Sequence, residues 1–329
     1  MTNNRKSTLT IIAAVSAMVA SVAAFLVTEA TAQFHNLGGA QRIRGHLSLA
    51  NEPAEGIGSP LNRAELIETF DDEFSDFRWY AEGAIYGKPG GGIWRTNFGY
   101  AGVQDRNSRN LPSNGEQQIY VDRGFRGTAA APLGLDPFRI NDGVLEITAD
   151  RTPDRVKPYI WNYEYTSGLI TSRDTFSQRY GVFEVRARVP KGRGLWSCIW
   201  LLPAAGGWPP EIDILEILGD RPTTLVTTWH SAASGEHTMG PVATEIPDAS
   251  ADFHTYAIDW DADQIRWYFD GFEVAHAQTP ADMHVPMYLL MNLAVGGNWP
   301  GSPDTNTQFP AALSIDWIRA YQRPDLKTK

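Results

Sequence analysis

Short segments of alternating apolar and polar residues, separated by turn residues, constrain the fold of this chain most strongly. Residues 180–190 are the clearest case. One side of this predicted strand is apolar: Phe183, Val185, Ala187 and Val189. The other side is mostly polar: Val182, Glu184, Arg186 and Arg188. No helical period persists along the chain. The pattern predicts an all-β sandwich of two antiparallel sheets.

Other segments have the same character. Residues 141–143, Asn-Asp-Gly, form a hairpin signal before the predicted strand 144–149. Residues 270–271, Asp-Gly, predict another turn. The remaining predicted strands are 69–74, 255–260, 265–269, 286–295 and 313–321.

Residues 211–216 read Glu-Ile-Asp-Ile-Leu-Glu, which places three carboxylates in a hydrophobic strand. Buried carboxylates cost several kcal/mol each unless they are paired or protonated. Stability does not require them here, but chemistry that needs a proton donor beside an ionised group does. An edge strand with solvated acids is the structural alternative. The apolar neighbours Ile212, Ile214 and Ile217 favour a covered strand.

The spacing of the acids predicts a local irregularity. In a regular strand Glu211 and Asp213 would share one side and Glu216 would lie opposite. A β-bulge at Ile214 and Leu215 would return Glu216 to the side of the other two acids. Carboxyl groups about 5 Å apart would fit a retaining glycosidase, and a gap of about 6.5–9.5 Å would fit an inverting one.

Composition excludes some partners and favours others. The net charge is −10, so nucleic acid is not expected as a partner. The chain contains 11 Trp, more than a core of this size needs, so we expect some of them in a sugar-binding cleft.

The N-terminus predicts export. Arg5 and Lys6 precede an apolar stretch at 11–27, and Ala30-Thr31-Ala32 resembles a cleavage site. We therefore predict a signal peptide at 1–32, with a retained anchor as the alternative, and a secreted, extracellular or periplasmic protein. We expect no integral membrane domain after cleavage, an N-terminal arm at 33–67, and one catalytic domain at 68–325. Residues 97–143 are long for a connector and are predicted to form a cleft wall.

Several motifs together resemble glycoside hydrolase family 16. The acidic run has the bulged form found in laminarinases, agarases and carrageenases. The segments that carry the rest of the resemblance are 180–190, 194–196, 200–203, 292–301 and 315–321. Residues 114–120 and 209–211 most resemble bacterial members that depolymerise exopolysaccharides of the succinoglycan type. The resemblance covers residues 68–322.

This resemblance implies a β-jelly-roll sandwich of two curved antiparallel sheets with a concave substrate cleft. It implies a secreted retaining endo-β-glycosidase that cleaves a β-glucan-type polysaccharide, either β-1,3 or mixed β-1,3/1,4. Glu211 would be the nucleophile, Glu216 the general acid/base, and Asp213 would hydrogen-bond the nucleophile. Glu216 would need a raised pKa, and the three acids would titrate as a group.

Further residues are candidates for substrate binding. Trp196, Trp200 and Trp299 are possible aromatic platforms. His230 is expected on the strand next to the acids, near the reacting sugar. Asn114 and Glu116 match a segment that resembles a sugar-contacting loop. His237, His254 and His284 are treated as ordinary residues.

No cofactor is expected for catalysis. Many relatives hold a structural calcium on the convex side, and Asp316 matches the aspartate that binds it, although it is the one side-chain ligand that the sequence offers. We expect a monomer. The alternatives are a galactan hydrolase of agar or carrageenan type, a transglycosylase, and a non-catalytic sugar-binding protein.

Overall fold

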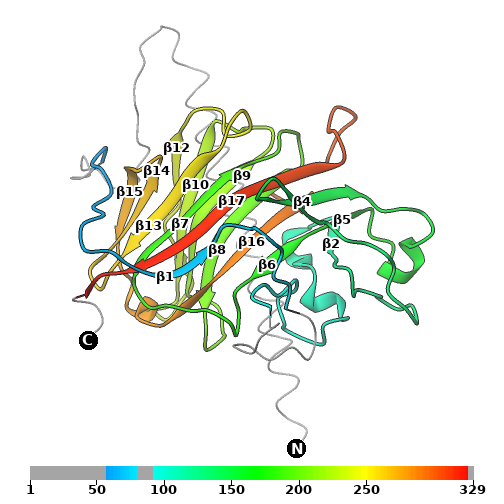
Figure 1. The fold of residues 1–329 in the computed structure, drawn as a ribbon, viewed down its shortest axis with the longest axis horizontal. Coiled ribbons are helices and arrows are strands. Elements are labelled where there is room, and N and C mark those ends of the chain that lie inside the picture. Colours follow the sequence, from blue (N-terminus) through cyan, green and yellow to red (C-terminus); the bar gives the residue numbers. More distant parts are fainter. Residues whose placement is uncertain (1–56, 81–91, 325–329) are drawn as a thin grey trace, which may run out of the picture.

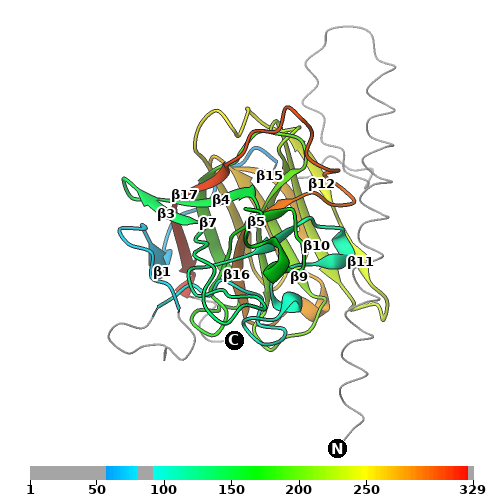
Figure 2. The ribbon, with the colours of Figure 1, turned by 90° about the vertical axis from the view of Figure 1, so that its right-hand side faces the viewer.

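The computed structural model describes residues 57–80 and 92–324. Within these ranges two sheets pack face to face, as Figures 1 and 2 show. The predicted signal peptide and residues 33–56 of the predicted arm lie outside the described residues. The predicted all-β sandwich is confirmed.

The larger sheet has ten strands. Eight follow one path, in the order β15 (Phe272–Gln278), β14 (Gln264–Phe269), β13 (His254–Trp260), β7 (Gly181–Arg188), β17 (Ala311–Gln322), β4 (Val144–Arg151), β5 (Tyr165–Ser167) and β2 (Gln118–Tyr120). The remaining two are β1 (Ile67–Asp72), which pairs with β17, and β3 (Phe138–Asn141), which pairs with β4.

The smaller sheet has seven strands. Their order is β11 (Thr238–Met239), β10 (Thr224–Ser231), β9 (Glu211–Leu218), β8 (Leu195–Pro203), β16 (Met287–Val295) and β6 (Leu169–Thr171), with β12 (Val242–Glu245) paired to β10. Among the described residues, four short 3-10 helices lie in the connections: η1 (Arg106–Ser108), η2 (Pro112–Asn114), η3 (Lys157–Ile160) and η4 (Ala281–Met283).

One pair of strands departs from the predicted antiparallel arrangement. β2 pairs with β5 in parallel, at the end of the larger sheet. A parallel pair needs a long connection, and residues 121–164 supply it. The sequence gives no sign of this, because a strand of three residues carries too little pattern to reveal its direction.

The main core lies between the sheets. β7 contributes Phe183, Val185 and Ala187 to it, as its alternation predicts. β9 contributes four residues from the smaller sheet: Ile212, Ile214, Leu215 and Ile217. Burial of such side chains is the dominant favourable term in folding. It also fixes which residues of each strand face away from the core.

Two predicted turns have the expected backbone. Asp142 and Gly143 have φ values of 49° and 79°, and Asn141 pairs with Val144 across them. Asp270 and Gly271 have φ values of 47° and 81° between β14 and β15. Positive φ at both central residues is the signature of the tight turn that matches the twist of a hairpin.

Residues 57–66, part of the predicted arm, lie against the outer face of the larger sheet. Leu61 packs with Val182, Ala257 and Tyr268. Arg63 donates a hydrogen bond of 2.8 Å to Glu184, which is 1% exposed. This part of the chain is therefore built into the sandwich.

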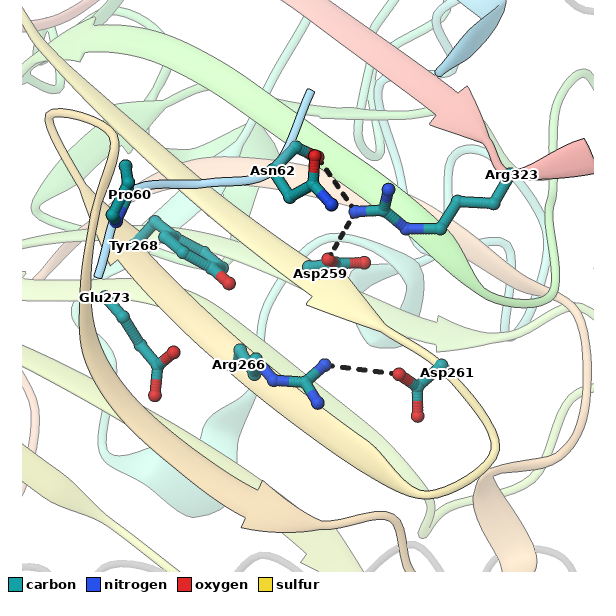
Figure 3. Close-up of a pocket in the computed structure, with 8 residues that line it drawn as sticks. All are labelled: Pro60, Asn62, Asp259, Asp261, Arg266, Tyr268, Glu273 and Arg323. Atoms are coloured by element: carbon teal, nitrogen blue, oxygen red, sulfur yellow. Dashed lines mark hydrogen bonds and ion pairs between the residues drawn. The ribbon is translucent and has the colours of Figure 1, made fainter. Parts of the chain in front are cut away.

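The same segment borders a pocket, shown in Figure 3. There Arg323 Nη2 lies 2.6 Å from Asp259 Oδ2 and 2.9 Å from the Asn62 carbonyl oxygen. Arg266 pairs with Asp261 at 3.2 Å. Both arginine side chains that line the pocket are therefore already paired, and no residue of the acidic strand β9 lines it.

No helix in the described ranges has the length and hydropathy needed to cross a bilayer.

Candidate active site

A β-bulge interrupts β9, as predicted. On β8, Ile199 pairs with Leu215 and Trp200 pairs with Asp213, so Ile214 has no partner on that strand. On β10 the register also shifts, so that a single residue, Thr227, lies opposite Ile214 and Leu215. The extra residue reverses the alternation of β9 beyond this point.

The bulge brings the three acids to one side of the sheet, which we call the acidic face. Both Ile214 and Leu215 point into the core. Asp213, just before them, and Glu216, just after them, therefore point to the opposite side of the sheet. Asp213 lies beside Trp200, and Glu216 beside Cys198. Trp200 and Cys198 belong to one apolar cluster outside the main core, which confirms that the two acids share this face.

Glu211 is held by an indole. Trp208 donates a hydrogen bond of 2.6 Å from Nε1 to Oε2 of Glu211. Burial and the charge of the nearby Asp213 together raise the pKa of Glu211 to about 8, although His230 and the Trp208 hydrogen bond act to lower it. The other oxygen, Oε1, faces His230.

Asp213 is 3% exposed. Burial raises its pKa to about 7, even though hydrogen bonding with Glu211 acts to lower it. Two interacting carboxyl groups titrate as a pair, so at neutral pH Glu211 and Asp213 share a proton. A shared proton leaves one member of the pair ionised.

The pKa of Glu216 is also raised. Burial raises its pKa well above the usual value, and the charges of Asp213 and Glu211 raise it further. Thr228 donates a hydrogen bond of 3.4 Å to Oε2 and partly offsets this effect. A carboxylic acid that stays protonated at neutral pH can donate that proton.

His230 lies beside the acids on β10. Its Nε2 is 3.2 Å from Asp213 Oδ2 and 3.7 Å from Glu211 Oε1. Its Nδ1 is 3.0 Å from Nε2 of His237. Burial lowers the pKa of His230, so its ring is neutral at neutral pH. The Trp208 ring packs against both imidazoles, with centroids 5.7 Å from His230 and 4.7 Å from His237.

Trp200 is held by a chain of buried polar groups. Its Nε1 donates a hydrogen bond of 2.8 Å to Asn292 Oδ1, and Asn292 Nδ2 donates one of 3.0 Å to the Tyr120 hydroxyl. Phe98 packs against Trp200 at 6.1 Å and stacks on Tyr100 at 5.2 Å. Tyr100 is 45% exposed, so an accessible aromatic ring adjoins this face.

Glycosyl hydrolases family 16 is the family whose model matches this chain, over residues 134–319. The chain belongs to family 16. The match includes the bulged strand and its acids. The match also includes strands of both sheets that precede and follow β9 in the chain.

Relatives and solved structures agree. Over 261 residues the chain is 41% identical to the endo-1,3-1,4-beta-glycanase ExsH of Rhizobium meliloti (strain 1021), with 79% of this chain and 53% of that protein covered. It is 34% identical to a beta-glucanase of Rhodothermus marinus, with coverage of 70% and 84%. The laminarinase catalytic domain of Thermotoga petrophila RKU-1 superposes with a TM-score of 0.62 at 31% identity, covering 79% and 98%.

The chain spans about half the length of some curated relatives. It covers 53% of ExsH and 57% of a second Rhizobium meliloti glycanase, EglC. The Thermotoga petrophila structure is a catalytic domain alone and is covered almost completely. The similarity therefore concerns the family 16 domain.

The remaining candidates lie at two places. Trp196 and Trp299 pack edge to face at 5.3 Å, next to the apolar cluster of the acidic face. Asn114 and Glu116 contact each other, with a hydrogen bond of 3.1 Å. Glu116 is 7% exposed and also accepts a bond of 2.6 Å from Gln118. Burial raises the pKa of Glu116 to about 7.

Asp316 lies on β17, away from the acids. Its carboxylate forms an ion pair with Arg186 on β7. A guanidinium at this carboxylate repels a cation, so the residues present do not fit the calcium site that family 16 implies. Sequence comparison with the family identifies the aspartate but not its arginine partner on another strand.

Three residues of the site were not among the candidates predicted from the sequence. His237, treated as an ordinary residue, contacts His230 from the connection between β10 and β11. Trp208 holds Glu211 from the loop before β9, and Asn292 holds Trp200 from β16. These contacts depend on how loops and strands meet in space. The one related prediction was that some of the 11 Trp would lie in a sugar-binding cleft.

Proposed function

We propose that this family 16 chain is a retaining endo-β-glycosidase that cleaves internal bonds of a β-glucan-type polysaccharide. The observation that carries the proposal is the bulge in β9, which brings Glu211, Asp213 and Glu216 to one face. A non-catalytic binding protein has no need of three acids grouped in this way, of which Asp213 is buried and Glu211 and Glu216 are partly buried, because such a group costs stability.

In the first step, Glu211 attacks the anomeric carbon and forms a glycosyl ester. The attacking atom is Oε1, because Oε2 accepts the Trp208 hydrogen bond. Glu216 gives its proton to the leaving glycosidic oxygen, which lets that bond break. Attack requires the proton shared by the pair to lie on Asp213, because only then is the nucleophile Glu211 ionised.

In the second step, the acid becomes a base. Glu216, now ionised, takes a proton from water as the water attacks the anomeric carbon. The ester breaks, Glu211 leaves as a carboxylate, and the product keeps the β configuration. Attack by a sugar hydroxyl in place of water would make the chain a transglycosylase.

The relatives guide the choice of substrate. Their names describe endo-1,3-1,4-beta-glycanases and beta-glucanases. We infer a glucan with β-1,3 or mixed β-1,3/1,4 linkages, including a bacterial exopolysaccharide. Trp200, Trp196, Trp299 and Tyr100 offer ring faces for stacking on pyranose rings. Asn114, Glu116 and His230 offer polar contacts.

Export and a monomeric state belong to the same proposal. The pattern of residues 1–32 supports cleavage before Gln33. Mass spectrometry of the exported chain should give a mature N-terminus at this glutamine. Elution at the mass of a single chain in gel filtration should accompany it.

The activity is tested with one panel of polymers: laminarin, lichenan, succinoglycan, agarose and carrageenan. Reducing ends and product sizes are measured for each. We expect internal cleavage of laminarin, lichenan or succinoglycan. Cleavage of agarose or carrageenan alone would identify a galactan hydrolase. Products longer than the substrate would identify a transglycosylase. Retention on a polymer gel without any cleavage would identify a binding protein.

A further inference from the structure

We propose that Glu211, Asp213 and His230 form a binding site for a transition-metal ion such as Zn²⁺, which occupies the acidic face in competition with the sugar. Within residues 57–80 and 92–324, this is the one group of three side chains of this kind whose ligand atoms converge, all within 4.8 Å of one another. Oxygen and imidazole nitrogen are ligands that Zn²⁺ takes readily.

The two distances from His230 to the carboxylates match the geometry of bound zinc. Metal–ligand bonds of about 2.0–2.2 Å at tetrahedral angles separate ligand atoms by about 3.4 Å. The imidazole Nε2 lies 3.2 Å from Asp213 Oδ2 and 3.7 Å from Glu211 Oε1. These two separations are within a few tenths of an ångström of the ideal value, and the third, between the two carboxylates, is no longer than 4.8 Å.

Each ligand is oriented by a neighbour. Trp208 fixes Oε2 of Glu211 and leaves Oε1 directed at His230. His237 contacts Nδ1 of His230 at 3.0 Å, so a proton on Nδ1 leaves the Nε2 lone pair directed at the acids. Such outer contacts orient the ligands of a metal and set their basicity.

Asp213 supplies an independent sign of a ligand. Its Oδ2 is buried and has no hydrogen-bond partner in the described structure, although Nε2 of His230 is close by. An unsatisfied buried carboxylate oxygen costs about 1–3 kcal/mol or more. A cation at the centre of the three atoms would satisfy it.

The charges of the three groups also balance a divalent ion. Once the proton shared by Glu211 and Asp213 is released on binding, two carboxylates and a neutral imidazole offset the two positive charges. With three protein ligands, a fourth tetrahedral position remains for water. The imidazole nitrogen favours Zn²⁺ over Ca²⁺ or Mg²⁺, which prefer oxygen and higher coordination numbers.

A bound ion would block cleavage, and this consequence rests on the proposed function. Coordination removes the attacking Oε1 of Glu211 and the proton-sharing partner Asp213. We therefore expect reversible inhibition by Zn²⁺ that EDTA relieves. The binding itself does not depend on activity.

The experiment measures binding in the full chain carrying Glu216→Gln, which keeps the three ligands. After removal of metal with EDTA, Zn²⁺ is titrated by calorimetry, and Co²⁺ is titrated with its visible absorption recorded. We expect a site with the intense bands of four-coordinate Co²⁺. The weak bands of the hydrated ion alone would overturn the proposal.

Two ligand variants and one control locate the site. Adding His230→Ala or Asp213→Ala should weaken Zn²⁺ binding at this site at least tenfold, with circular dichroism used to confirm folding. His254→Ala is the matched control, because His254 pairs with Asp270 at 2.7 Å on the other sheet and belongs to no such group of three. Unchanged affinity in both ligand variants would overturn the proposal.

Failure of this proposal is distinguishable from failure of the proposed function. If the natural chain cleaves polymer and Zn²⁺ binding does not depend on His230, the proposed metal site is wrong and the proposed glycosidase function stands. If His230→Ala loses Zn²⁺ binding and the natural chain cleaves no polymer, the metal site is supported and the proposed glycosidase function is wrong.

Discussion

Glu211 and Glu216 face the same side of β9, although an odd number of positions separates them in the strand. In a regular strand such residues lie on opposite faces. The bulge at Ile214 and Leu215 removes the conflict while both of these side chains stay in the core. One backbone irregularity thus serves the packing and the proposed chemistry together.

Glu216→Gln should abolish cleavage of polymer and spare part of the activity on an activated substrate. Glutamine cannot protonate a leaving oxygen, and general acid catalysis contributes about 10²–10⁴-fold. An aryl glycoside with a good leaving group needs no such proton. Initial rates on both substrates provide the measurement. Glu245→Gln, at an exposed position, is the control. Full polymer activity in Glu216→Gln would remove the acid role from this residue.

The same substitution should stabilise the protein at high pH. The raised pKa of Glu216 means that the folded chain keeps a proton that the unfolded chain releases above about pH 4.5. The free energy of unfolding therefore falls as the pH rises from there through the folded-state pKa. Glutamine does not ionise, so this loss disappears.

We expect equal melting temperatures for the two proteins near pH 4, and at pH 8 a melting temperature about 2–8 °C higher for Glu216→Gln. This corresponds to roughly 1–2 kcal/mol for a domain of this size. Differential scanning calorimetry at both pH values measures the difference. A variant that melts at or below the natural chain at pH 8 would show that burial of this carboxyl carries no cost.

Asn292→Ala should weaken substrate binding and lower stability. It leaves the buried Trp200 indole N–H without its partner and removes one of the partners of the Tyr120 hydroxyl. Unpaired buried polar groups cost about 1–3 kcal/mol each. We expect a lower melting temperature and a KM that rises more than kcat falls. Asn306→Ala, whose side chain is exposed, is the matched control. Identical kinetics in the two variants would show that Trp200 does not contribute to sugar binding.

Tyr100→Ala should raise KM for polymer without changing stability. The ring is 45% exposed and stacks on Phe98, which packs against Trp200. Loss of one stacking contact of about 0.5–1.5 kcal/mol raises KM about 2- to 10-fold. Tyr159, 44% exposed on η3, provides the comparison through Tyr159→Ala. Equal KM values in both variants would place the sugar elsewhere.

The bulge was predictable because the apolar residues of β9 are out of phase. Ile212 and Ile214 fit one face, and Leu215 and Ile217 fit it only after a shift of one residue. The two tight turns were predictable because Asp-Gly pairs favour positive φ. These features depend on residues that are close in the sequence.

Contacts between distant segments were not predictable. His237 approaches His230 from a hairpin connection, and Arg186 on β7 pairs with Asp316 on the neighbouring strand β17. In each case the residues next to either partner in the sequence give no sign of the contact. The parallel pairing of β2 with β5 belongs to the same class, since it depends on the path of a long connection.

Trapping of the glycosyl ester tests the central claim most directly. The natural chain is incubated with an activated 2-deoxy-2-fluoro glycoside of a β-glucan disaccharide, and the intact protein and its peptides are weighed by mass spectrometry. The account predicts an increase of one glycosyl unit, located on Glu211. A chain that turns over β-glucan but carries the label on another residue, or carries none, would contradict it.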